Sequence, residues 1–150
     1  MKKLILIIMI MIIIPLNINA SILTEVVDKE LKQIAYDNYY KNDIDKTVKS
    51  VYKIVKNKLN YVKLYNEKNY ALAWWQEKGD CSEITNLNVK ILSYLNISTQ
   101  SVYGWAFVNN GESGYHKWFL YKNNENEWVS FDNNFIDKLF ITSYENNLYN

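Results

Sequence analysis

The chain has 150 residues and a nearly balanced charge, with 17 basic and 16 acidic residues, one histidine and one cysteine. Every basic residue is a lysine, so the planar arginine fork that reads guanine and phosphate is missing and nucleic-acid binding has little support. A single cysteine excludes an internal disulfide, and one cysteine with one histidine cannot supply the usual zinc ligand sets. We therefore expect neither a metal nor another cofactor.

The N-terminal segment has the pattern of a secretory signal. Two lysines precede an uninterrupted apolar run over residues 4–14, and Ala20 offers a cleavage site. The run is short for a membrane span, although an uncleaved membrane anchor is the alternative. We predict residues 1–20 as a signal peptide and residues 21–150 as a single exported domain, which is secreted, periplasmic or at the cell surface. The domain would contact a membrane only if the signal stays uncleaved.

Helical spacing of apolar residues predicts three helices in the first half of this domain. The second has an apolar stripe at every third or fourth position, with lysines outside it, and either Asn42 or Asp43 can cap its start. The third is short and is expected to end at Gly79 in a left-handed conformation. The three helices are expected over residues 21–40, 44–59 and 70–78.

The next helix carries the cysteine at its first position. Asp80 and Glu83 have the spacing of a capping box, which places Cys81 beside unpaired backbone N–H groups at the positive end of the helix dipole. Both features favour the thiolate over the thiol, so we predict an activated cysteine. The buried face of this helix is expected to comprise Ile84, Leu87, Ile91, Leu92 and Leu95.

The remaining chain predicts an antiparallel β-meander with strands over residues 101–108, 115–121 and 127–132, separated by turn-forming asparagine and glycine residues. Together with the helices, this gives an α+β fold in which the N-terminal helices and the cysteine-bearing helix pack on the sheet.

Strand register decides whether the candidate catalytic residues can meet. If the second hairpin closes with Tyr121 opposite Glu127, His116 lies opposite Asp132 on the same face, where the carboxylate can fix the imidazole tautomer. A slip of one residue would place the two on opposite faces.

The first hairpin is expected to pair Val108 with Tyr115, which places Trp105 opposite Trp118 and Phe107 opposite His116. The face that carries the histidine would then be largely aromatic and would pack on the cysteine-bearing helix.

Four motifs in this order resemble the transglutaminase-like superfamily, a branch of the papain-like thiol enzymes. The resemblance covers about residues 70–135, and Lys117 stands where a smaller residue is expected. The motifs are Gly79-Asp80-Cys81, Val102-Tyr103-Gly104, His116-Lys117-Trp118 and Trp128-Val129-Ser130-Phe131-Asp132.

The resemblance implies a catalytic triad in which Cys81 is the nucleophile, His116 the general base and acid, and Asp132 the orienting group. Such a triad attacks an amide carbonyl and forms a thioester, which water or an amine then resolves. The large animal transglutaminases have extra β domains for which this chain has no room, so protein crosslinking and calcium dependence are not expected. Small exported members of such families often act as peptidases, including on cell-wall peptides.

Tryptophans near the motifs are candidates for supporting roles. Trp75 or Gln76, just before the cysteine, could supply a side-chain N–H to an oxyanion hole, although Trp75 could simply pack and Gln76 could face solvent. Trp118 is a candidate for substrate binding and could also brace the strands of the triad, as could Trp128.

The combined interpretation is an exported cysteine peptidase or amidohydrolase that acts on a peptide or protein substrate. Three alternatives stay open at this point. The chain could be another papain-like cell-wall peptidase, an amine-accepting transglutaminase, or an inactive transglutaminase-like module that only binds.

Overall fold

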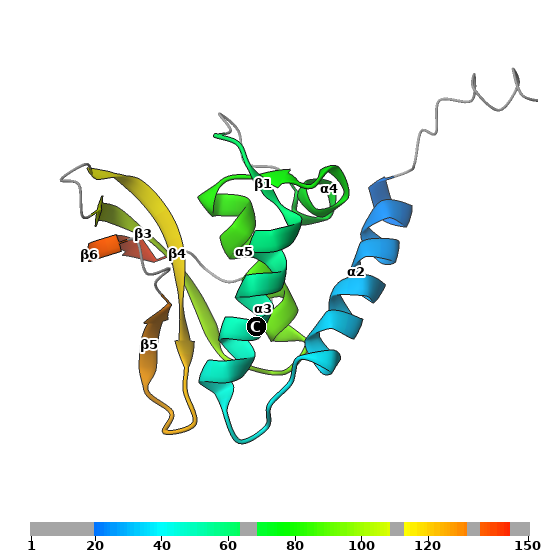
Figure 1. Ribbon diagram of the computed structural model, residues 1–150, viewed down its shortest axis with the longest axis horizontal. Helices are drawn as coiled ribbons and strands as arrows, with labels where there is room; N and C mark the ends of the chain where they lie inside the picture. The colour runs from blue at the N-terminus through cyan, green and yellow to red at the C-terminus, as the bar shows by residue number, and fades with distance from the viewer. Residues whose placement is uncertain (1–19, 64–68, 109–112, 132–135, 145–150) are drawn as a thin grey trace, which may run out of the picture.

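The computed structural model describes residues 20–63, 69–108, 113–131 and 136–144, and over these residues the fold is α+β, as predicted (Figure 1). The helices form a cluster on one side of an antiparallel sheet, with α5 between the sheet and α2. The helices are α2 (Ala20–Asp37), α3 (Ile44–Lys58), α4 (Tyr70–Gln76) and α5 (Cys81–Ser93).

Local sequence signals account for the bounds of the helices. Asp43, one of the two expected caps, accepts a hydrogen bond of 2.8 Å from the backbone N–H of Lys46 and begins α3. The valines of the α3 stripe are fully buried against the other helices. The sequence predicts Gly79 as the left-handed residue after α4, but the residue with that conformation is Glu77, with φ of 53°.

The sheet has four strands in the order β5-β4-β3-β6. The three predicted strands form the expected antiparallel meander, and a fourth strand, which the sequence analysis did not predict, adds to the free edge of β3. A separate parallel pair, β1 (Asn60–Tyr61) and β2 (Lys78–Gly79), links the end of α3 to the start of α5. The four strands are β3 (Thr99–Val108), β4 (Ser113–Lys122), β5 (Trp128–Phe131) and β6 (Ile136–Tyr144).

The second hairpin has a different register from the predicted one. Tyr121 pairs with Val129 rather than with Glu127. The turn runs through Glu127 because the Asn123 side chain accepts hydrogen bonds from two backbone N–H groups within it, so pairing starts only at Trp128. A shift of two residues keeps the same side chains on each face. Asp132 lies outside the described residues, and so does its expected pairing with the histidine.

The register of the first hairpin also differs from the predicted one, by an odd number of residues. The β3 side chains that were expected on the face of the histidine therefore lie on the opposite face. His116 lies opposite Gly104, and Trp105 lies opposite Tyr115, so Trp105 shares no face with the histidine. Phe119 and Tyr121, on the alternate face of β4, pack on the helices. The prediction that the histidine face packs on the cysteine-bearing helix is therefore wrong. In the observed register Trp118 faces Val102, and both are buried, whereas Trp105 faces Tyr115 on the other face, and both are exposed.

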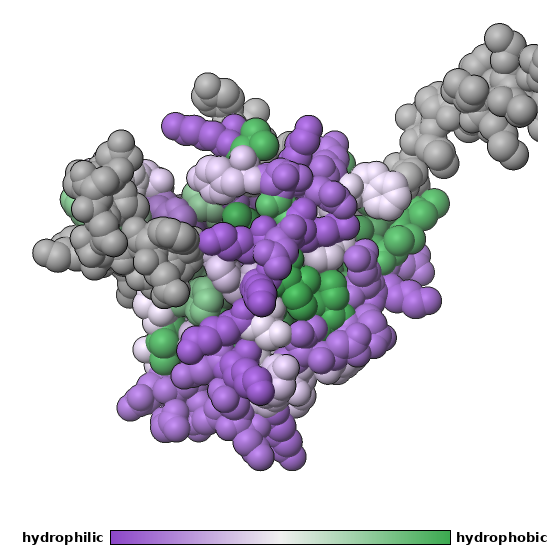
Figure 2. All heavy atoms as spheres, in the orientation of Figure 1, coloured by the Kyte–Doolittle hydropathy of each residue, from purple (hydrophilic) through white to green (hydrophobic). Residues whose placement is uncertain are grey.

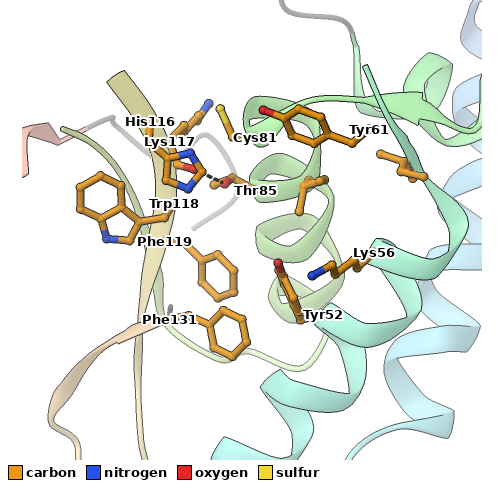
Figure 3. Close-up of a pocket in the computed structure, with 12 residues that line it drawn as sticks. Tyr52, Lys56, Tyr61, Cys81, Thr85, His116, Lys117, Trp118, Phe119 and Phe131 are labelled. Atoms are coloured by element: carbon orange, nitrogen blue, oxygen red, sulfur yellow. Dashed lines mark hydrogen bonds between the residues drawn. The ribbon is translucent and has the colours of Figure 1, made fainter. Parts of the chain in front are cut away.

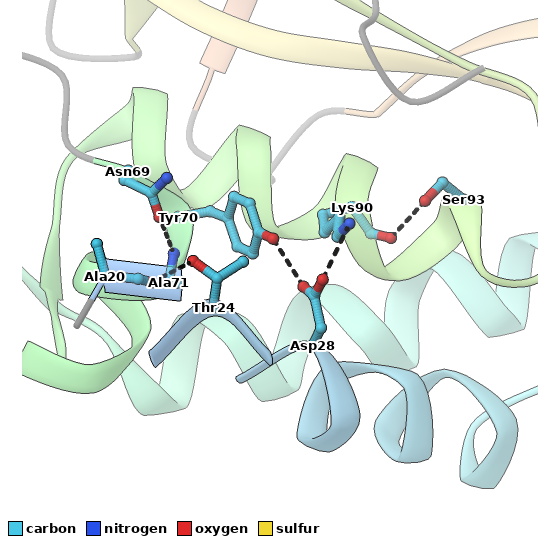
Figure 4. Close-up of polar contacts among 8 residues, drawn as sticks. All are labelled: Ala20, Thr24, Asp28, Asn69, Tyr70, Ala71, Lys90 and Ser93. Atoms are coloured by element: carbon cyan, nitrogen blue, oxygen red, sulfur yellow. Dashed lines mark hydrogen bonds and ion pairs between the residues drawn. The ribbon is translucent and has the colours of Figure 1, made fainter. Parts of the chain in front are cut away.

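Polar contacts between helices fix how α2 lies on the core (Figure 4). Asp28 of α2 accepts a hydrogen bond of 2.7 Å from the Tyr70 hydroxyl of α4. The same carboxylate is 3.6 Å from the ammonium of Lys90 on α5. The partly exposed Asp28 side chain thus connects three helices. We expect it to fix their relative orientation while adding little to the free energy of unfolding.

Hydrophilic side chains cover most of the face seen in Figure 2, and hydrophobic side chains show mainly along α2 and where it meets the neighbouring helices. Within the residues that the structure describes, no helix has both the length and the apolar content needed to cross a membrane.

Candidate active site

The predicted capping box holds the start of α5. The carboxylate of Asp80 accepts a hydrogen bond of 2.9 Å from the Ser82 N–H, and the Glu83 carboxylate accepts one of 2.9 Å from the Asp80 N–H. Glu83 is fully buried. These reciprocal bonds satisfy backbone donors that the helix itself cannot pair, and they fix Cys81 as the first helical residue.

Gly79 allows this start to lie against α3. A Cβ atom at position 79 would be 2.6 Å from the Cβ of Glu83 and 2.9 Å from a terminal methyl of Leu59. The position therefore needs a glycine because of close approach, and not because of a left-handed backbone.

The backbone of Lys117 in β4 connects the strand to the first turn of α5. Its carbonyl accepts a hydrogen bond of 3.1 Å from the Thr85 hydroxyl, and its N–H donates to the Cys81 sulfur. The Lys117 side chain is 2% exposed, and its ammonium lies 5.0 Å from the centre of the Tyr103 ring. The adjacent residue, His116, is thereby placed beside the cysteine-bearing turn.

Two adjoining cavities meet at these residues. The first, here called the apolar cavity, extends between α3, α5 and the sheet (Figure 3), and its lining includes Leu59, Ile84, Phe119 and Phe131. The second, here called the polar groove, is lined by Lys63, Asp80, Ser82, Tyr103 and Tyr115. Four residues line both cavities: Tyr61, Cys81, His116 and Lys117.

Burial sets the protonation states of the candidate nucleophile and base. It raises the pKa of the Cys81 thiol; the hydrogen bond from the Lys117 N–H lowers that pKa, and the charge of Asp80 raises it further. Burial also lowers the pKa of His116, against the opposing charge of Asp80. The resting pair is therefore a neutral thiol and a neutral imidazole. This direction of the Cys81 pKa is opposite to the one expected from its position at the helix start, because desolvation outweighs the donors there.

The Trp118 side chain packs against the His116 imidazole. Its ring stacks on the His116 imidazole, with the centres 6.0 Å apart and the planes inclined by 13°. The indole N–H donates a hydrogen bond of 3.1 Å to the Ser130 hydroxyl of β5, and the residue is 4% exposed. Trp118 lines the apolar cavity, but little of it is open to a substrate. The expected bracing role fits these contacts better than substrate binding does.

The other candidates lie farther from the cavities. Trp75 is 56% exposed, and neither Trp75 nor Gln76 is among the residues that line the two cavities, so their oxyanion role stays a prediction. Sequence reasoning did not find Tyr61, which lines both cavities. No periodic or motif signal marks that residue, because only the pairing of β1 with β2 brings it to the site.

No group of three or more histidine, cysteine, aspartate or glutamate side chains fit to hold a metal ion occurs within the ranges that the structure describes. What Cys81 and His116 bring together is a thiol beside an imidazole, in a partly buried cavity.

Comparisons with known proteins found a matching family model and similar solved structures. The family model of the transglutaminase-like superfamily matches residues 32–133. The structure is similar to that of a proposed cysteine protease from Cytophaga hutchinsonii, with a TM-score of 0.64 and 18% identity over 79% of this chain and 42% of the other. It is also similar to a TGase structure, with a TM-score of 0.54 and 14% identity over 80% of this chain and 34% of the other. The chain thus spans less than half the length of either structure, and no curated protein sequence matches it.

Proposed function

The chain belongs to the transglutaminase-like superfamily, and on that premise we propose that it is an exported thiol hydrolase that cleaves an amide or isopeptide bond in a peptide, such as a cell-wall peptide. The observation that carries the proposal is the meeting of Cys81 and His116 at the junction of two cavities, with the sulfur held by the Lys117 N–H. Thiol and imidazole together can both attack an amide and protonate its leaving group.

In the proposed reaction, the Cys81 sulfur bonds to the amide carbonyl carbon as its proton moves to His116. The tetrahedral intermediate collapses, the C–N bond breaks, and His116 returns the proton to the leaving amine. His116 then takes a proton from water, whose oxygen bonds to the thioester carbon. The C–S bond breaks, the acid is released, and His116 returns the proton to the Cys81 sulfur. Asp132 is the proposed orienting group for the imidazolium. Because the resting pair is neutral, the first proton transfer accompanies the attack.

Water is the proposed acyl acceptor. Lys63 lines the polar groove, and its positive charge disfavours the approach of a second ammonium such as a substrate lysine. Among the described residues that line the two cavities, Asp80 is the only carboxylate, and it is occupied as the cap of α5. The groove therefore supports hydrolysis more than transfer to an amine.

The test offers purified protein a set of cell-wall peptides and glutamine peptides together with an excess of a small amine. We expect free acid as the main product, a thioester on Cys81 detectable by mass spectrometry, and loss of both in Cys81→Ala. Ser93→Ala, at the far end of α5, is the matched control and should keep full activity. Efficient amine incorporation with little free acid would make the protein a transferase. If no acyl-enzyme forms, the protein is a binding module rather than an enzyme.

Export is tested separately by sequencing the N-terminus of the protein recovered from its host. The proposal expects Ser21 as the first residue. An intact Met1 in the membrane fraction would support an uncleaved anchor.

A further inference from the structure

The β1–β2 pair holds Tyr61 beside the start of α5. Tyr61 pairs with Gly79, two residues before Cys81. Backbone hydrogen bonds of 2.8 Å from Asn60 to Glu77 and 3.0 Å from Val62 to Gly79 fix the pairing on both sides of Tyr61. The position of the tyrosine relative to the cysteine is therefore set by the backbone and does not depend on the packing of its ring, which is largely exposed.

The Tyr61 hydroxyl lies where the two cavities meet. Figure 3 shows the phenol oxygen pointing toward the Cys81 sulfur from the side away from β4. The residue is 66% exposed, but its hydroxyl end lies close enough to the site for burial to raise its pKa, and the charges of Cys81 and Asp80 raise it further. The hydroxyl therefore keeps its proton over the whole neutral range and acts as a donor there.

A hydroxyl donor at this place matters for acyl transfer. As the sulfur bonds to the carbonyl carbon, the π electrons of the carbonyl move to its oxygen, and the negative charge must be stabilised by preorganised donors. The backbone N–H of Cys81 at the helix start can serve as one donor. We propose that the Tyr61 hydroxyl is the second, so that Tyr61 is a catalytic residue that hydrogen bonds to the oxyanion of the tetrahedral intermediate. This inference rests on the proposed thiol chemistry of Cys81.

Two reactions of the same thiol separate this role from any effect on the nucleophile. With p-nitrophenyl acetate, the S–C bond forms, a tetrahedral oxyanion appears and p-nitrophenolate leaves, while His116 takes the thiol proton. With iodoacetamide, the S–C bond forms and iodide leaves, and no oxyanion appears. The ratio of the acylation rate to the alkylation rate therefore measures the stabilisation of the oxyanion alone.

Tyr61→Phe should lower the rate of acylation by p-nitrophenyl acetate by about 10²-fold, the usual effect of removing one oxyanion donor, and should leave alkylation by iodoacetamide unchanged. Tyr36→Phe is the matched control, because Tyr36 is also an exposed tyrosine but lies in α2 and lines neither cavity. It should change neither rate. Trp75→Phe and Gln76→Ala should behave like this control.

Three outcomes would overturn the proposal: an equal fall of both rates in Tyr61→Phe, no fall in either, or a selective fall of acylation in the Trp75 or Gln76 variant. A wild-type protein whose Cys81 reacts with neither reagent would instead contradict the proposed function, so the two failures are distinguishable. Since Tyr61 is mostly exposed, Tyr61→Phe should fold normally, and its urea unfolding curve checks this.

Discussion

Gly79→Ala tests whether close packing at the start of α5 positions the nucleophile. The added methyl would lie 2.6 Å from the Glu83 Cβ and 2.9 Å from a Leu59 methyl. The leucine can rotate its terminal methyl away, but the Glu83 Cβ is attached directly to the backbone of α5. The helix start must therefore move, and the movement separates the groups of the capping box.

The expected cost has two parts. Inserting a methyl into a packed site typically costs about 1–3 kcal/mol. Weakening the cap adds about 1 kcal/mol, because both of its hydrogen bonds involve carboxylates. The sum is a loss of about 2–4 kcal/mol of unfolding free energy, and with a urea m-value of about 2 kcal/mol/M the midpoint should fall by about 1–2 M.

The chain provides its own control in Gly114, where an added Cβ would meet no atom of the described residues within 4 Å. Gly114→Ala should leave the urea midpoint unchanged or raise it slightly. Equal midpoints for Gly79→Ala and the wild type would refute the reasoning. So would equal shifts in the two variants. Iodoacetamide labelling of the folded Gly79→Ala protein provides a second measurement, and its rate should differ from that of the wild type because Cys81 moves with the helix start.

Three further predictions concern ionisation and buried polar contacts. Alkylation of Cys81 should rise about tenfold per pH unit up to about pH 8 without levelling, because burial raises the thiol pKa above its usual value, and a plateau at lower pH would show an activated thiolate instead. Asp80→Asn keeps a good helix cap but removes a charge that raises the pKa of Cys81 and of His116, so it should speed alkylation at pH 7, and an unchanged or slower rate would contradict the assignment. Tyr121→Phe removes a hydrogen bond of 2.7 Å to the Asp45 carboxylate and should lower the unfolding free energy by about 1–2 kcal/mol in urea melts, whereas no loss would mean that this contact between β4 and α3 is not stabilising.

The helices were predictable because their signals are local. The cap at Asp43 and the capping box of Asp80 and Glu83 act over three residues and hold in the structure. The family and the α+β class also followed from the order and spacing of the motifs.

Register and ionisation were not predictable from the sequence because they depend on contacts between distant segments. The second hairpin pairs two residues later than expected because the Asn123 side chain extends the turn, and composition alone does not reveal such a bond. The first hairpin takes the register that sets the buried Val102 opposite the buried Trp118. The pKa of Cys81 depends on how deeply β4 and α5 bury the sulfur, and Tyr61 reaches the site only through pairing with a residue that lies far along the chain.

The backbone contacts of Lys117 affect which amino acids position 117 can accept in related sequences. Both contacts that tie β4 to the first turn of α5, the N–H to the sulfur and the carbonyl to the Thr85 hydroxyl, come from the main chain. Main-chain contacts do not depend on which side chain occupies the position. Residue 117 can therefore differ between relatives, or be varied in a library, while Cys81 keeps its distance from the strand that carries His116. A single codon can then change the lining of both cavities while Cys81 keeps its place beside His116.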